Sequence, residues 1–135
     1  FLTAFYGIID IEENTILCAN AGHHPPLLIS KSQKTVIPLP IKGKLLGLIP
    51  DLLYEEKQFS FSPEERLVLF TDGLTEHASP DKRIKYEETL FESDIKNSID
   101  LNAQLASDFL INSARSYTKN ETFEDDVTLL IVDRF

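Results

Sequence analysis

The sequence contains no methionine, no tryptophan and a single cysteine, Cys18, among its 135 residues. One cysteine cannot form a disulfide within the chain, so a reducing, cytoplasmic setting is the simplest expectation. Because Cys18 lies in the apolar run ILCANA, we expect a small buried core residue rather than a reactive thiol. The chain opens with the strand-like run FLTAFY and no initiating methionine, which predicts a piece of a longer protein.

Positive charge and long apolar runs are also scarce. Thirteen lysines and arginines face 22 aspartates and glutamates, so the formal net charge is −9. An acidic surface repels phosphates, which argues against a nucleic-acid partner, but it suits cations that relieve repulsion between clustered carboxylates. No apolar stretch reaches the roughly 18 residues of a membrane-spanning helix, so we expect no direct membrane contact by this segment.

Short alternating or apolar runs predict strands over the first half of the chain. Residues 3–10 and 15–20 form two such runs, joined by a polar bridge of hairpin length. PLLIS continues as a third strand, and TVIPLP is expected at a sheet edge because its prolines lack a backbone donor. Residues 53–61 alternate, and the continuous apolar run LVLFT predicts a buried central strand.

Helical signals gather late in the chain. Residues 81–97 are charged and only weakly helical, whereas residues 100–117 carry large apolar side chains near helical spacing. We expect Asp100 to cap this helix and Lys119-Asn120 to mark its end, before a last buried strand, VTLLIVDRF. Strands joined by short turns, followed by helices, predict one α+β domain over residues 1–135.

Aspartates stand at the ends of two apolar runs. Asp72 follows LVLFT and precedes Gly73, whereas Asp125 and Asp126 directly precede VTLLIVD. If the two strands are antiparallel neighbours, Asp72 and Asp125 can converge on one divalent cation, because Mg²⁺ and Mn²⁺ prefer rigidly held oxygen ligands. The plain alternative stays open: Asp-Gly is a common turn dipeptide, and aspartate often flanks a strand.

A third candidate is the loop that follows Asn20, which reads AGHHPP. Gly22 permits close backbone approach, and His23 can bind an anion or orient a carboxylate, although a structural or solvated histidine is the commoner case. His23 and His24 point in opposite directions if extended, so one metal would not readily take both. The sequence has no G-x-S-x-G motif and no phosphate-binding glycine loop, so hydrolysis would need metal-activated water.

The motifs FLTAFYGIID, CANAGHHPPLLI, LLGLIP, LVLFTDGLTEH and FEDDVTLLIVD occur in this order. Together they resemble the SpoIIE/RsbU branch of the type 2C (PPM) metal-dependent serine/threonine protein phosphatases, from Phe1 to about Val132. The resemblance implies an α-β-β-α sandwich with mainly antiparallel sheets and two Mn²⁺ or Mg²⁺ ions in a cleft at one edge. It also implies signal transduction through hydrolysis of phosphoserine or phosphothreonine on a partner protein, similar to an anti-anti-sigma factor in sigma-factor regulation.

The resemblance assigns roles to individual residues. Asp72 and Asp125 match catalytic aspartates that ligate metal, and Asp126 matches a supporting position. Residues that would shape the cleft around these ligands are Thr71, Gly73, Thr128, Asn20 and His23.

Two departures narrow the expected activity. The family's Asp-x-x-Gly-His-Gly segment and a still earlier acidic strand are missing, and residues 84–87 read IKYE where a Phe-Gly pair is usual. We therefore expect a sandwich without its N-terminal strands, weak metal binding and little turnover by residues 1–135 alone. Unpaired strand edges and uncovered apolar faces would favour a homodimer or strand exchange.

Two other readings remain at this point. The chain could be a non-catalytic regulatory or interaction module with a phosphatase-like fold, which retention of both Asp72 and Asp125 argues against. A structural α+β domain whose aspartates only form turns would have to explain several ordered motifs as coincidences.

Overall fold

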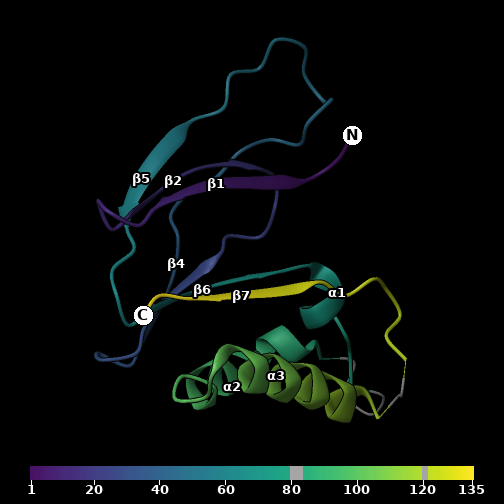
Figure 1. Cartoon of the computed structure of the whole chain (residues 1–135). Helices are drawn as coiled ribbons and strands as arrows, with labels where there is room; N and C mark the ends of the chain where they lie inside the picture. The colour runs from purple at the N-terminus through teal and green to yellow at the C-terminus, as the bar shows by residue number, and fades with distance from the viewer. Residues whose placement is uncertain (80–83, 120–121) are drawn as a thin grey trace.

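The computed structural model describes residues 1–79, 84–119 and 122–135 of the chain. Two antiparallel sheets lie face to face, and the described helices all lie beneath one of them (Figure 1). This β-β-α arrangement confirms the expected α+β fold as a partial sandwich. The sequence predictions for residues 81–83 lie outside the described residues.

The upper sheet has three strands in the order β1-β2-β5. The strands β1 (Ala4–Asp10) and β2 (Thr15–Ala21) form the expected hairpin, and β5 (Glu56–Ser60) pairs with the other edge of β2. In the hairpin turn, Asp10 Oδ1 accepts hydrogen bonds from the backbone amides of Glu12 and Glu13, at 3.0 and 2.9 Å. Asn14 then takes the left-handed conformation, with φ 53°, that asparagine tolerates better than most residues.

The lower sheet has four strands in the order β4-β3-β6-β7. They are β3 (Leu27–Ser30), β4 (Thr35–Pro38), β6 (Glu65–Phe70) and β7 (Leu129–Asp133). The proline-bearing β4 lies at the edge and the apolar β6 lies in the centre, as the sequence predicts. The strands β6 and β7 are antiparallel neighbours, so the end of β6 lies beside the start of β7.

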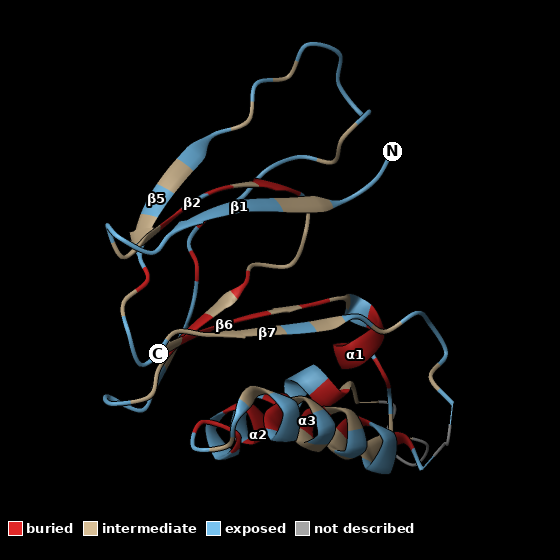
Figure 2. Ribbon diagram, viewed as in Figure 1, coloured by how far each residue is buried: buried red, intermediate tan, exposed pale blue. Residues whose placement is uncertain are grey.

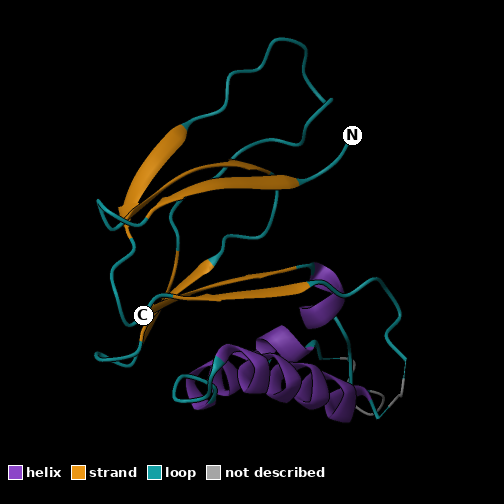
Figure 3. Cartoon of the chain, viewed as in Figure 1, coloured by secondary structure: helices purple, strands orange, loops and turns teal. Residues whose placement is uncertain are grey.

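Four helical segments cover the outer face of the lower sheet (Figure 3). They are the single turn α1 (Asp72–Thr75), the 3₁₀ turn η1 (Tyr86–Glu88), α2 (Phe91–Asn97) and α3 (Ala103–Thr118). The sequence indicated helix near η1 and over most of α3, but it did not distinguish η1 from α2. No described helix is long and apolar enough to cross a membrane.

The predicted cap of α3 is wrong. Asn102, not Asp100, precedes the helix with an extended backbone, and its side-chain oxygen accepts a hydrogen bond from Leu105 N at 2.9 Å. Asp100 instead forms an exposed ion pair with Lys34. Both residue types cap helices well, so composition could not choose between them. Lys119 ends the helix, as expected, and has a left-handed backbone, whereas Asn120, the other residue of the predicted end, lies outside the described residues.

Two hydrophobic cores hold the layers together (Figure 2). One lies between the sheets and includes Cys18, which is 1% exposed, so the predicted burial is confirmed and burial raises the pKa of its thiol. The other lies between the lower sheet and the helices. The central strand serves both, since Leu67 packs in the first core and Val68 in the second.

The outer face of the upper sheet is bare in the described part of the chain. Tyr6 and Ile8 on β1 are 66% and 51% exposed, and Leu17, the cross-strand partner of Ile8, is 37% exposed. Figure 2 shows this side of β1 largely exposed. The observation agrees with the expectation that the chain leaves an apolar sheet face uncovered.

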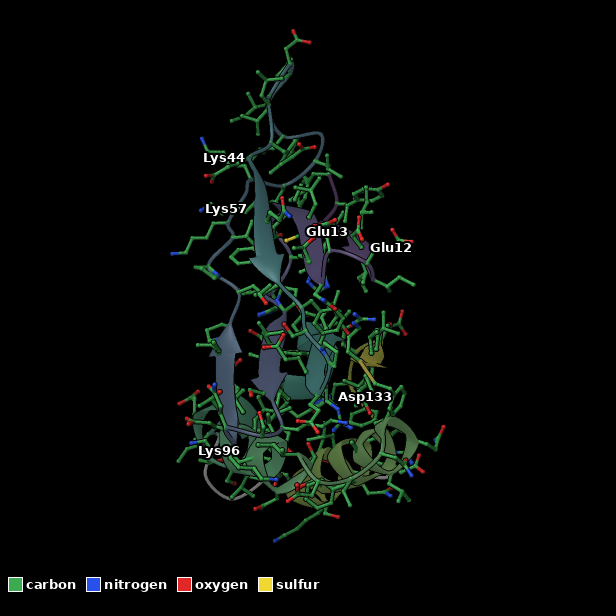
Figure 4. The ribbon with its side chains drawn as sticks, turned by 60° about the vertical axis from the view of Figure 1, so that its left-hand side comes forward. Glu12, Glu13, Lys44, Lys57, Lys96 and Asp133 are labelled. Atoms are coloured by element: carbon green, nitrogen blue, oxygen red, sulfur yellow. The ribbon has the colours of Figure 1, made fainter. Side chains whose placement is uncertain are left out.

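A buried ion pair joins the lower sheet to the helices. The Arg66 side chain on β6 is fully buried; its Nε lies 2.6 Å from Asp133 Oδ1 and its Nη2 lies 2.9 Å from Oδ2. The same guanidinium donates to the carbonyl oxygens of Ser98 and Leu101, at 3.0 and 2.6 Å, in the connection between α2 and α3. Figure 4 labels Asp133 at this junction. The pair therefore positions the helices on the sheet.

Asp133 stays charged at this buried place. Burial alone would raise its pKa, but hydrogen bonds and positive charge from Arg66 and from Lys31, whose Nζ lies 3.0 Å away, hold the pKa below its ordinary value. The pair thus stabilises the fold at neutral pH. That stabilisation is lost as the pH falls below about 3.9, the ordinary aspartate value, and through the lowered pKa of Asp133.

Replacing Arg66 tests how far the fold depends on this pair. We expect Arg66→Ala to lower the free energy of unfolding by about 3–5 kcal/mol, because it leaves the Asp133 carboxylate and two carbonyl oxygens buried without their main partner. Lys34→Ala, which removes an exposed ion pair, should cost less than about 1 kcal/mol. Urea unfolding followed by circular dichroism measures both, and equal effects would contradict the role given to Arg66.

Candidate metal and phosphoryl site

A pocket of about 290 Å³ lies where β6 ends and the segment before β7 begins. Asp72, the first residue of α1, lines it just after β6, and Glu124 and Asp125 line it from the segment before β7. The rest of the lining comes from Gly73, Glu76 and His77. The pairing of Phe70 with Leu129 in the β6–β7 ladder brings these segments together. The structure thus unites Asp72 and Asp125 in the way the strand argument required.

Thr71 extends the pairing of the two strands into the pocket. Its backbone amide donates to Thr128 O at 3.0 Å, and its hydroxyl accepts from Thr128 N at 2.9 Å. The same hydroxyl donates to Asp126 O at 3.1 Å. One small side chain therefore holds the backbone on the C-terminal side of Asp125.

Gly73 is required by close packing and not by an unusual backbone angle. A Cβ at this position would lie 2.2 Å from Asp126 O, far inside any real contact. The start of α1 and the acidic segment before β7 are consequently in backbone contact. Any side chain at residue 73 would push Asp72 and Asp125 apart.

The two aspartates lack a cationic partner among the described residues. Gly73 N donates to Asp72 Oδ1 at 3.0 Å, Asp126 N donates to Asp125 Oδ1 at 2.7 Å, and neither carboxylate forms an ion pair there. Glu76 differs, because Lys85 Nζ lies 2.9 Å from its carboxylate and lowers its pKa through a hydrogen bond and its charge. Asp72 and Asp125, like the neighbouring Glu124, thus form no ion pair among the described residues and remain open to a cation.

Hard divalent cations fit this donor set only in part. Mg²⁺ and Mn²⁺ accept carboxylate oxygens, and both Asp72 and Asp125 are exposed in the pocket. No group of three or more histidine, cysteine or acidic side chains is placed to hold a metal among residues 1–79, 84–119 and 122–135. The two aspartates would therefore supply a minority of an octahedral shell.

A smaller pocket of about 90 Å³ lies on the other side of Asp72. The AGHHPP loop supplies Gly22, His23 and His24 to its lining, together with Thr3 and Thr71. Asp72 is common to both pockets, so the loop and the acidic pocket form one continuous region around this carboxylate. His23 and His24 lie beside Asp72 but do not line the pocket that contains Asp125.

Asn20 shapes this loop from beneath. Its side chain is 2% exposed, donates to His23 O at 2.9 Å and to Ile41 O at 3.2 Å, and accepts from His23 N at 2.8 Å. His23 Nδ1 lies 2.8 Å from His24 O, so one ring nitrogen is engaged within the loop. Asn20 therefore fixes the backbone of His23 and the course of the loop beside Asp72.

Sequence reasoning missed three of the residues that line the acidic pocket: Glu76, His77 and Glu124. Side chains four residues apart share one face of a helical turn, so Glu76 could have been inferred from Asp72. Glu124 is the neighbour of an assigned residue. His77 is 4% exposed, and its Nε2 has no hydrogen-bond partner among the described residues. No sequence signal marked it.

The chain is similar to known phosphatases in sequence and in fold. The family profile described as Stage II sporulation protein E (SpoIIE) matches residues 1–135. Phosphoserine phosphatase RsbU of Bacillus subtilis (strain 168) is 30% identical over 145 residues, which cover 99% of this chain and 39% of RsbU. Phosphoserine phosphatase RsbP of the same organism is 35% identical over 74 residues, or 55% of this chain and 18% of RsbP. The chain spans less than half the length of each.

Solved structures show the same fold at low sequence identity. The SiaA-PP2C domain of Pseudomonas aeruginosa superimposes with a TM-score of 0.79 at 18% identity, over 98% of this chain and 51% of that domain. The phosphatase domain of SpoIIE from Bacillus subtilis, presoaked with Mn, gives 0.75 at 18% identity, over 98% and 56%. The described chain therefore corresponds to about half of a PP2C-type domain.

Gly73→Ala tests the close packing at the pocket. We expect a loss of about 2 kcal/mol or more in the free energy of unfolding, because the new methyl group collides with the Asp126 carbonyl, which is backbone and cannot rotate away. Gly7→Ala is the matched control, since its methyl would meet only the side chains of Ile16 and Phe5 at 3.2 Å. Thermal unfolding of both variants provides the comparison, and a neutral Gly73→Ala would show that the two segments are not held together.

Proposed function

The chain belongs to the SpoIIE family, and we propose that it forms the C-terminal part of a metal-dependent phosphatase domain in a longer parent protein. The proposed reaction is hydrolysis of phosphoserine or phosphothreonine on a partner protein. The observation that carries the proposal is the convergence of Asp72 and Asp125 on one pocket through the β6–β7 pairing. A role in turn formation alone does not explain why both aspartates line one pocket without a cationic partner among the described residues.

In this proposal Asp72 and Asp125 hold Mn²⁺ or Mg²⁺, with two ions in the intact domain. Bound ions of this kind lower the pKa of water and neutralise charge that develops on a phosphoryl group. Thr71 and Gly73 keep the two carboxylates at one place by holding the backbone of Asp126. Asp126 and Thr128 act through these backbone contacts and not as ligands.

The substrate we propose is a phosphorylated protein similar to an anti-anti-sigma factor. This rests on the likeness to RsbU over 99% of the chain and is supported by the exposure of Asp72 and Asp125, which leaves the carboxylates accessible to a side chain presented by another protein. The net charge of −9 gives no support to a nucleic acid.

The assignment is tested in the intact parent protein. We expect Asp72→Ala and Asp125→Ala each to lower Mn²⁺-dependent phosphatase activity by about 100-fold or more, because even changes that only disturb metal ligands cost about 10- to 100-fold. Asp108→Ala, an exposed aspartate on α3, is the matched control and should retain full activity. Release of phosphate from a phosphoserine protein measures the rate.

Unchanged rates in both ligand variants would rule out the assignment, and a folded parent without any phosphatase activity would favour the non-catalytic module.

Residues 1–135 alone should bind Mn²⁺ only weakly in isothermal titration, because two carboxylates leave most of an octahedral shell to water. Tight binding of two ions by this chain would contradict that expectation.

A further inference from the structure

The segment that carries Asp125 has no regular secondary structure between residue 122 and the start of β7. Its acidic side chains Glu124, Asp125 and Asp126 are all exposed. Phe123 and Val127 are the partly buried residues that pack against the core beneath the lower sheet. Asp125 therefore lies between two apolar contacts, and its position depends on both.

The C-terminal side of this segment is held by the backbone contacts to Thr71 and Gly73 described above. The N-terminal side is held through Phe123. The Phe123 ring lies 4.8 Å from the His77 ring, centroid to centroid, with an angle of 32° between the planes. The guanidinium carbon of Arg115, in the last turn of α3, lies 5.5 Å from the centroid of Phe123.

His77 links this contact to the pocket. The residue is 4% exposed, lines the acidic pocket with Asp72 and Asp125, and packs its ring on Phe123. Its backbone carbonyl also accepts a hydrogen bond from Tyr86 N at 2.8 Å, which ties it to the helical layer. The buried His77 ring, fixed through this backbone contact, therefore offers a rigid surface on which Phe123 packs.

Repulsion between carboxylates would move the acidic segment at residues 124–126 away from the pocket if no contact opposed it. Glu124, Asp125 and Asp126 follow one another, and the first two line a pocket that already contains Asp72 and Glu76. Like charges at this spacing repel and favour movement of the segment away from the pocket unless a cation or a packing contact opposes it. The contact of Phe123 with His77 and with the cationic Arg115 supplies both apolar packing and a positive charge.

We propose that His77, Phe123 and Arg115 form an aromatic anchor that positions Asp125 at the pocket before any cation binds. His77 and Phe123 are then positioning residues, which act on the metal through Asp125. The consequence for metal binding rests on the proposed function, whereas the anchoring of the segment does not.

The experiment uses the intact parent protein without metal. Hydrogen exchange followed by mass spectrometry should show faster exchange of the peptide covering residues 122–128 in Phe123→Leu and in His77→Leu, with exchange in β6 unchanged. Isothermal titration with Mn²⁺ should then show about tenfold weaker binding in both variants, the lower end of the range for residues that orient metal ligands. Arg115→Met, at an exposed site, should shift both measurements in the same direction without risk to the fold.

Ring-preserving variants separate anchoring from general loss of stability. Phe123→Tyr and His77→Phe should retain slow exchange and Mn²⁺ affinity within about threefold of the natural protein, because the ring contact survives. Phe59→Leu, a partly buried aromatic residue of the other core, should lower stability without changing exchange at residues 122–128.

Each contrary result overturns the proposal. Unchanged exchange in Phe123→Leu and Arg115→Met would show that the anchor holds nothing. Equal losses in His77→Phe and His77→Leu would show that the imidazole nitrogen, and not the ring contact, matters. Faster exchange with unchanged Mn²⁺ affinity would refute positioning of Asp125. Failure of the phosphatase assignment would appear instead as normal activity of both Asp72→Ala and Asp125→Ala, which these measurements do not involve.

Discussion

The antiparallel pairing of β6 with β7 is the constraint on which both the fold and the site depend. At one end of this pair, Arg66 and Asp133 are cross-strand partners and form the buried ion pair that joins the sheet to the helices. At the other end, the ladder closes at Phe70 and Leu129 and places both acidic segments beside one pocket. A slip of one residue in this register would turn the buried arginine out of its site and separate the aspartates.

The carboxylates at the two ends of the β6–β7 strand pair lie in opposite environments. Asp133 is buried and receives hydrogen bonds from Arg66 and Lys31, which hold its pKa low and make it a structural charge. Asp72 and Asp125 are exposed and receive only the backbone amides of their neighbours, so their charge is not neutralised within the described chain. Positive charge thus compensates the carboxylate at one end of the strand pair, whereas no ion pair does so at the other end among the described residues.

Much of the fold followed from the sequence because local signals and long-range pairing agreed. The edge position of β4 followed from its prolines, and the central position of β6 followed from its apolar run. The cap of α3 did not follow, because Asp100 and Asn102 are both good capping residues and the sequence does not say at which one the helix begins. In the candidate site, motifs singled out Asp72 and Asp125 as candidates, and the structure places both at one pocket, but the packing of His77 on Phe123 depends on two segments that meet only in the folded chain.

Asp72 and Asp125 stand in separate segments, so their shared pocket exists only when β6 and β7 are paired. Cation binding would therefore stabilise the folded state selectively, as it does wherever a metal site is absent from the unfolded chain. The contacts of Thr71, Gly73 and Phe123 reduce the order that a cation would otherwise have to impose on the segment before β7. In the proposed site Asp72 and Asp125 supply a minority of the octahedral shell, so cation binding would depend chiefly on the ligands that complete it.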